Sequence, residues 1–322
     1  MTRSRALADG TPSPMAVVYY AQRAPLAMLI TEGTQPSADG QGYLHTPGIY
    51  TRAHADGWRA LADAVHARGG YLVIQLMHAG RMAHPDNTPH HRTPLAPSAI
   101  APGVDMHTPA GKQPAPTPRA MSTMDIEQTI GDFADAAGMA IQAGADAIEI
   151  HAGNGYLLHQ FLAPNANHRS DTYGGPIANR ARFTLQVAEA VADMIGRERT
   201  GIRISPAAML GGLDEGPEAA ALYRYLVGEV ARLDLAFLDV FSFTGEALLH
   251  DIRARWPNAL LHVRAERTYD QVATDIESGR ADIAAVAAWG PQPDFIKRLR
   301  TDAPLRPYPT TFCTGGAHGC GD

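Results

Sequence analysis

The sequence predicts an α/β fold, a (β/α)8 TIM barrel that forms a single domain over residues 1–322. Short apolar runs alternate with amphipathic helical patterns after residue 25, which is typical of a parallel sheet with helical crossovers. The chain is also long and apolar enough, at 322 residues and 45% hydrophobic, to bury one large core. Seven strand–helix units follow one another, and this number indicates a barrel.

The candidate strands are short runs rich in valine, isoleucine, leucine and alanine. They are 27–31, 71–76, 147–151, 201–205, 236–241, 260–263 and 283–286. The residues before 25 are too few and too polar to provide a convincing eighth strand. We therefore expect a barrel whose first strand is short or absent.

Two helical patterns are especially regular. Apolar residues recur at i, i+4 and i+7 from Ile126 to Phe133, and every fourth residue from Phe183 to Ile195 is apolar. Each pattern predicts a helix that packs one apolar stripe against the sheet. Four glycines fall near expected helix ends, where a left-handed cap is favoured: Gly70, Gly144, Gly201 and Gly279.

One segment departs from this alternation. Nine prolines lie between Pro85 and Pro118, without helical or strand periodicity. We interpret residues 77–122 as a long excursion over the barrel mouth rather than a linker. Its histidines lack a cysteine or carboxylate cluster at ligand spacing, so we predict no metal at His84, His90 and His91.

Composition narrows the possible partners to small molecules. A net charge of −6 without a Lys/Arg-rich block argues against nucleic acid and anionic membranes. No apolar run approaches the ~18 residues of a membrane helix, and the N-terminus lacks a signal-peptide core. Cys313 and Cys320 match neither a zinc knuckle nor a disulfide framework. We expect a cytoplasmic protein, and the sequence leaves a monomer and a homodimer both open.

The most informative stretch follows the predicted strand 147–151. It reads His-Ala-Gly-Asn-Gly-Tyr-Leu-Leu from residue 151, so a histidine, an amide and a phenol side chain lie within six residues at the end of one strand. These polar groups can converge on the carbonyl of a small molecule. A lone histidine at a strand end would more often be a structural residue with its hydrogen bonds satisfied. The surrounding motif therefore decides whether this histidine is functional.

With these residues the chain resembles the old yellow enzymes, the FMN-dependent ene-reductases of the NADH:flavin oxidoreductase group. The matching segments are 2–6, 19–23, 30–34, 75–81, 151–182, 203–206 and 311–312. They span nearly the whole chain, and the run 151–182 is long and highly specific. The resemblance implies an old-yellow-enzyme-like barrel, but the fold alone does not decide the reaction.

The resemblance assigns roles to the substrate end of the site. In the family, a His and an Asn three residues apart hold the carbonyl or nitro oxygen of an activated alkene, and a Tyr two residues further protonates the α-carbon. His151, Asn154 and Tyr156 occupy these positions, and two donors with a positioned acid suit an oxygen that gains charge. Met77 and Cys313 match residues at the substrate pocket, although either could simply be an apolar filler.

The resemblance also names residues for the flavin ring. Gln75 and Arg203 match residues that contact its pyrimidine edge, and Thr2 matches one that contacts the carbonyl at C4. Arg203 could equally be a buried structural cation paired with Glu149.

The two loops expected to bind the flavin phosphate depart from the family pattern. Ala265-Glu266 replaces a Gly-Gly pair, and Ala287-Ala288 replaces a Gly-Arg pair. A carboxylate near a phosphate dianion costs on the order of several kcal/mol at an effective dielectric near 20, and the lost Arg forfeits another ~1.5–3 kcal/mol. Alternatively, Arg264 or Arg267 turns inward and replaces the missing charge.

From these departures we favour a chain that has given up FMN, binds no cofactor and catalyses a non-redox reaction. The reaction would be a cyclisation, including pericyclic ring closure, or an isomerisation of an unsaturated, carbonyl-containing natural-product intermediate. The alternative hypothesis is an FMN-dependent ene-reductase that consumes NAD(P)H. A third hypothesis is a non-catalytic binding protein.

Overall fold

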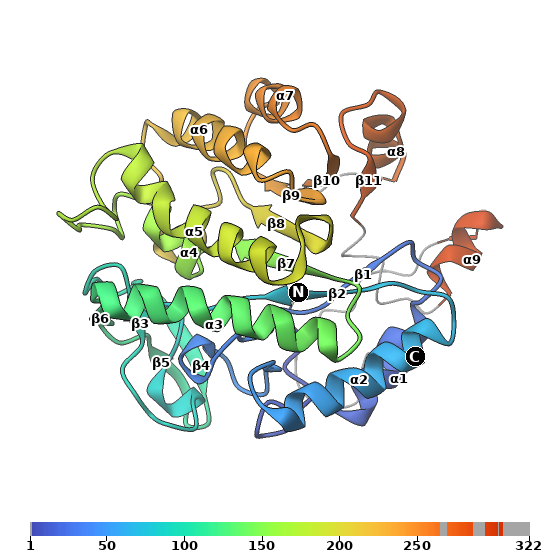
Figure 1. Cartoon of the computed structure of the whole chain (residues 1–322), viewed down its shortest axis with the longest axis horizontal. Helices are drawn as coiled ribbons and strands as arrows, with labels where there is room; N and C mark the ends of the chain where they lie inside the picture. Colours follow the sequence, from blue (N-terminus) through green and yellow to red (C-terminus); the bar gives the residue numbers. More distant parts are fainter. Residues whose placement is uncertain (1, 265–268, 286–293, 302, 305–322) are drawn as a thin grey trace.

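The computed structural model shows one parallel seven-stranded sheet that curls through the centre of the molecule, with helices packed outside it (Figure 1). The residues that the structure describes are 2–264, 269–285, 294–301, 303 and 304. The sheet order is β1-β2-β7-β8-β9-β10-β11, and all neighbours are parallel. The strands are β1 (Leu29–Ile30), β2 (Leu72–Leu76), β7 (Ala147–Ala152), β8 (Thr200–Ile204), β9 (Phe237–Ser242), β10 (Ala259–Arg264) and β11 (Ile283–Ala284).

This architecture confirms the predicted α/β barrel class. Each predicted strand overlaps an observed one, and the strands at the two ends of the sheet order, β1 and β11, are the shortest. Among the described residues, no strand lies between β1 and β11.

The helices form because their apolar stripes face the sheet. Ser122 and Asp125 form a capping box that starts α3, and Ile126 and Phe133 on its inner face are fully buried. No helix in the described part of the chain combines the length and apolar character needed to cross a membrane. The helices are α1 (Pro14–Gln22), α2 (Arg52–His66), α3 (Thr123–Gln142), α4 (Leu157–Leu162), α5 (Ile177–Ile195), α6 (Ala219–Arg232), α7 (Glu246–Arg255), α8 (Tyr269–Glu277) and α9 (Phe295–Arg300).

The glycine predictions were partly wrong. Gly201 lies inside β8, where a side chain would collide with the Phe237 ring of β9, so close packing explains this glycine. At the end of α2 the left-handed residue is Gly69, with φ +74°, rather than Gly70. The other two glycines adopt the expected left-handed conformation, at φ +100° and +71°: Gly144 and Gly279.

The proline-rich segment 77–122 contains short strands that its sequence did not predict. A hairpin forms from β4 (Asp105–Thr108) and β5 (Gly111–Pro114), and β3 (Leu95–Ala96) pairs with β6 (Arg119–Ala120). Figure 1 shows these strands together on one side of the molecule. Arg81 donates to the carbonyls of Gly211 and Gly212 at 3.0 and 3.1 Å, so the segment packs on the loop after β8.

Candidate active site

A cavity of about 250 Å³ opens among the barrel strands and has a polar and an apolar wall. Leu29 and Ile30 of β1, Leu261 of β10 and Ile283 of β11 belong to the apolar wall. The polar residues that line it are Arg3, Tyr19, Tyr20, Arg23, Thr31, Glu32, Gln75, Arg203 and Asp239. A concave apolar pocket with a few convergent polar groups suits a small molecule.

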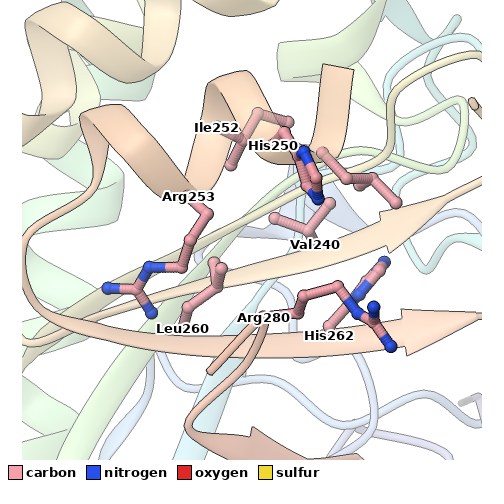
Figure 2. Close-up of a pocket in the computed structure, with 8 residues that line it drawn as sticks. Val240, His250, Ile252, Arg253, Leu260, His262 and Arg280 are labelled. Atoms are coloured by element: carbon pink, nitrogen blue, oxygen red, sulfur yellow. The ribbon is translucent and has the colours of Figure 1, made fainter. Parts of the chain in front are cut away.

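A second cavity has only about 10 Å³ and is walled by α7 and strands β9 and β10 (Figure 2). This volume accommodates at most about one water molecule. Arg253 beside it is engaged in an ion pair with Asp282 at 2.6 Å. We therefore treat it as a packing gap and place the site at the larger cavity.

Four charged or amide side chains form a buried cluster at the polar wall of the large cavity. Gln75, Glu149, Arg203 and Asp239 come from β2, β7, β8 and β9, and the strand register places Gln75 beside Glu149 and Arg203 beside Asp239. Gln75 donates to Glu149 at 2.5 Å, and Arg203 pairs with Asp239 at 3.3 Å. The suggested pairing of Arg203 with Glu149 was therefore wrong, because the register gives Arg203 a carboxylate on its other side.

The cluster has two carboxyl groups for one guanidinium. Burial and the neighbouring Asp239 raise the pKa of Glu149 to about 8, and burial also raises the pKa of Asp239. The pair therefore retains a proton at neutral pH. Nε of Arg203 is buried without a hydrogen-bond partner in the described part of the protein. An acceptor on a bound molecule would satisfy this donor.

His151 lies at the end of β7, opposite Arg203 in the register, and is 4% exposed. Burial, with the nearby Arg203 charge, holds the pKa of His151 well below its ordinary value, so the imidazole is neutral. Its Nδ1 accepts the backbone N–H of Gly153 at 3.3 Å. The ring proton is therefore on Nε2, which makes Nε2 a hydrogen-bond donor.

Asn154 follows in a left-handed conformation, with φ +53°. The Ser205 hydroxyl, from the residue after β8, donates to the amide oxygen of Asn154. Because the amide oxygen accepts this bond, the amide nitrogen is the group that can donate a hydrogen bond to a substrate. Sequence reasoning missed Ser205 as a site residue, because nothing in its local pattern shows which loop it contacts.

Tyr156 completes the group, with its ring centroid 5.1 Å from that of His151. Its hydroxyl lies 3.4 Å from the Tyr43 hydroxyl and also interacts with the Thr2 side chain. Burial raises the pKa of Tyr156, so the phenol keeps its proton at neutral pH. Tyr43 was not predicted, since it is 113 residues away in sequence.

Four further predicted site residues are Met77, Arg264, Arg267 and Cys313. Met77 is 4% exposed and packs against Gly33, where an added Cβ would lie 2.5 Å from its sulfur. Arg264 ends β10, but its side chain lies outside the described part of the structure, as do Arg267 and Cys313. The altered loops with Glu266 and Ala288 also lie outside it.

Comparisons with known proteins point to one family. The profile of the NADH:flavin oxidoreductase / NADH oxidase family matches residues 1–236. The "Probable flavin mononucleotide-dependent alkene reductase" of Leishmania infantum is 38% identical over 335 residues, which cover 100% of this chain and 91% of that protein. The 12-oxophytodienoate reductase 2 of Arabidopsis thaliana is 35% identical, over 98% of this chain and 87% of the relative.

Solved structures that are similar to this chain include a reductase and an old yellow enzyme homologue. Morphinone reductase in complex with tetrahydroNAD superposes with a TM-score of 0.95 at 37% identity, covering 100% of this chain and 91% of that one. An old yellow enzyme homologue from Zymomonas mobilis has a TM-score of 0.95 at 32% identity, covering 100% and 93%.

These comparisons contradict the prediction of a flavin-free cyclase or isomerase without a cofactor. Full-length similarity reaches a relative named as dependent on flavin mononucleotide, and a reductase solved with a nicotinamide analogue. The sequence argument named contacts to the flavin ring but estimated the binding free energy only at the phosphate end. In the structure two of the predicted ring contacts, Gln75 and Arg203, line one cavity, and the third, Thr2, interacts with Tyr156.

Proposed function

The chain belongs to the NADH:flavin oxidoreductase / NADH oxidase family, and we propose that it is an FMN-dependent ene-reductase that consumes NAD(P)H. Its substrate would be a small conjugated molecule, an alkene activated by a carbonyl or nitro group. The reaction adds a hydride to the β-carbon and a proton to the α-carbon, and NAD(P)H is the electron donor.

One observation carries this proposal: two donors and an acid lie within six residues at the end of β7, with the His151 and Tyr156 rings in contact. Nε2–H of His151 and the amide N–H of Asn154 would hold the substrate oxygen, which gains negative charge as the hydride arrives. Both groups are neutral donors and therefore bind the oxygen without transferring a proton to it. This arrangement polarises the alkene and leaves protonation to Tyr156.

Tyr156 would deliver the proton to the α-carbon. It retains its proton because burial raises its pKa, and Tyr43 and Thr2 contact its hydroxyl. The Tyr43 hydroxyl, 3.4 Å away, would return a proton to Tyr156 after this step.

The polar wall of the large cavity fits a flavin ring. The unpartnered Nε of Arg203 can donate to an acceptor on the pyrimidine edge, and Gln75 lines the same cavity. Thr2 would contact the flavin carbonyl at C4 from beside Tyr156. When bound, FMN would supply the hydride. Arg264 and Arg267 remain the candidates for the phosphate, and Met77 and Cys313 remain the candidates for substrate contact.

The test is reconstitution with FMN, followed by NADPH oxidation in the presence of 2-cyclohexenone under anaerobic conditions. We expect a stoichiometric flavin spectrum and formation of cyclohexanone. Tyr156→Phe should slow product formation about 10- to 100-fold while it keeps the flavin. A protein that stays colourless and forms no cyclohexanone would refute the proposal.

A further inference from the structure

Three buried side chains outside the cavity connect the two loops that carry Asn154 and Ser205. His159 lies on α4, Tyr223 on α6, and Glu215 in the loop between β8 and α6. His159 and Tyr223 are 0% exposed and Glu215 is 5% exposed. Together we call them the Glu215 network.

The protonation of His159 follows from its two neighbours. Its Nδ1 accepts the backbone N–H of Gly155 at 3.0 Å, so this nitrogen carries no proton. Its Nε2 therefore carries the proton and donates to Oε1 of Glu215 at 2.6 Å. The tautomer of His159 and the bond to Gly155 thus depend on the carboxylate.

Glu215 uses both of its oxygens as acceptors. Oε1 also accepts from the Tyr223 hydroxyl at 2.5 Å, and Oε2 accepts the backbone N–H of Ala207 at 2.9 Å. Such a set of donors compensates the burial of a carboxylate. It also fixes the loop after β8 to the loop after β7.

These contacts close a ring around Asn154. Gly155 is the next residue in the chain, and its N–H is held by His159. On the other side, Ser205 donates to the Asn154 amide and lies two residues before Ala207, which is held by Glu215. Asn154 is therefore fixed from both loops.

The backbone of this loop needs such support. Asn154 and Gly155 both have positive φ, +53° and +88°. A Cβ on Gly155 would lie 2.6 Å from the Leu210 carbonyl, so the two loops are in close contact. Sparsely populated conformations persist only where several interactions hold them.

We propose that Glu215 is a positioning residue for the reaction: through His159 and the backbone of Gly155 it orients Asn154 toward the substrate. This inference rests on the proposed ene-reductase function, because it assigns the network to a residue that would hold the substrate oxygen.

Glu215→Gln is the sharpest substitution. An amide has one acceptor oxygen, whereas His159 and Ala207 require an acceptor on each side of the group. Either orientation of the amide therefore places an N–H against a buried donor. The matched control is Glu218→Gln, three residues away and 60% exposed in its ion pair with Arg180.

In the FMN-loaded holoenzyme, we expect Glu215→Gln to lower kcat/KM for 2-cyclohexenone about 10- to 100-fold with unchanged flavin content. Glu218→Gln should stay within about twofold of the wild type. In an Asn154→Ala background, Glu215→Gln should cost less than about threefold, because its effect acts largely through Asn154. Equal losses in both backgrounds would overturn the proposal.

Amide hydrogen exchange of the flavin-free protein provides a readout that does not depend on activity. We expect faster exchange in Glu215→Gln within peptides covering 153–157 and 205–208, and unchanged exchange in α6 and β9. A uniform increase throughout the protein would indicate a purely structural role and overturn the proposal. If the wild type reduces no enone but the local exchange changes, the proposed function fails while the link between the loops stands.

Tyr223→Phe covers the case in which Glu215→Gln does not fold. It removes one donor to Oε1 and leaves the bonds from His159 and Ala207 in place. We expect a loss of a few-fold in kcat/KM and the same dependence on Asn154. A loss that is independent of Asn154 would contradict the positioning role.

Discussion

The centre and the two ends of the sheet differ in how firmly they fix their side chains. Strand β7 has six residues and pairs on both sides, with β2 and β8. Strands β1 and β11 have two residues each and one partner each in the described sheet. The groups proposed to hold the substrate oxygen follow β7 at the centre, whereas Leu29, Ile30 and Ile283 of the apolar cavity wall lie on the two end strands. The proposed chemistry is thus placed where a long strand is paired on both sides.

The strongest test of this difference removes the central cation. Arg203→Met leaves the buried Asp239 without its counter-ion, so we expect a loss of about 3–5 kcal/mol in the free energy of unfolding and failure to retain FMN. Arg253→Met, at the more exposed pair with Asp282, should cost about 1 kcal/mol. Urea denaturation and flavin absorbance measure both effects. Equal costs would mean that the two regions do not differ.

The second test addresses the chemistry at the centre. His151→Ala removes one of the two oxygen-directed donors, and we expect kcat/KM for an enone to fall about 100-fold or more with the melting temperature nearly unchanged. His250→Ala on α7, beside the small cavity, serves as the control and should have no effect. Steady-state kinetics decides, and an active His151→Ala enzyme would contradict the assigned role.

A third test compares packing at the two locations. Ile150 of β7 is fully buried, and we expect Ile150→Ala to cost roughly 2–5 kcal/mol. Ile283 of β11 is partly buried, so Ile283→Ala should cost only about 1 kcal/mol. Chemical denaturation measures the free energy of unfolding of both variants. A larger loss in Ile283→Ala than in Ile150→Ala would contradict this view of the sheet.

The last test concerns pH. The pKa of Glu149 is raised from 4.5 to about 8 by burial and by Asp239, so the folded protein keeps a proton that the unfolded chain releases. The free energy of unfolding should therefore fall as pH rises through this window, by at most about 1.4 kcal/mol per pH unit for this group, and level off above it. Glu149→Gln should remove this dependence.

Denaturation of both proteins between pH 5 and pH 8 checks this sign. If the wild type becomes more stable over that range relative to the Glu149→Gln variant, the carboxyl is not held in its protonated form.

Local sequence patterns predicted the strands and the main helices because each element buries particular faces. Apolar residues therefore recur in the sequence with the spacing of that element. Phe183, Val187 and Val191 are all fully buried, as their spacing indicates. Gly201 was misjudged because its role depends on Phe237 of the neighbouring strand. A glycine that makes room for a ring has the same local signal as one that caps a helix.

The correction on FMN has a similar origin. The sequence argument summed the penalties of two short loops and left out what the ring end of the site contributes. Gln75 and Arg203 are distant in the sequence, and only the assembled strands bring them to one cavity.

The sequence by itself determined the barrel and the order of its elements, since these follow from periodicity, and it predicted His151, Asn154 and Tyr156 as site residues from one continuous motif and a family resemblance. The tertiary structure decided which groups they contact: Ser205 bonds to Asn154, and Tyr43 lies beside Tyr156. It also decided that Arg203 pairs with Asp239 rather than with Glu149. Hydrogen bonds and charges act over a few ångströms. Strand register and loop packing, which arise only on folding, determine which groups lie within that range.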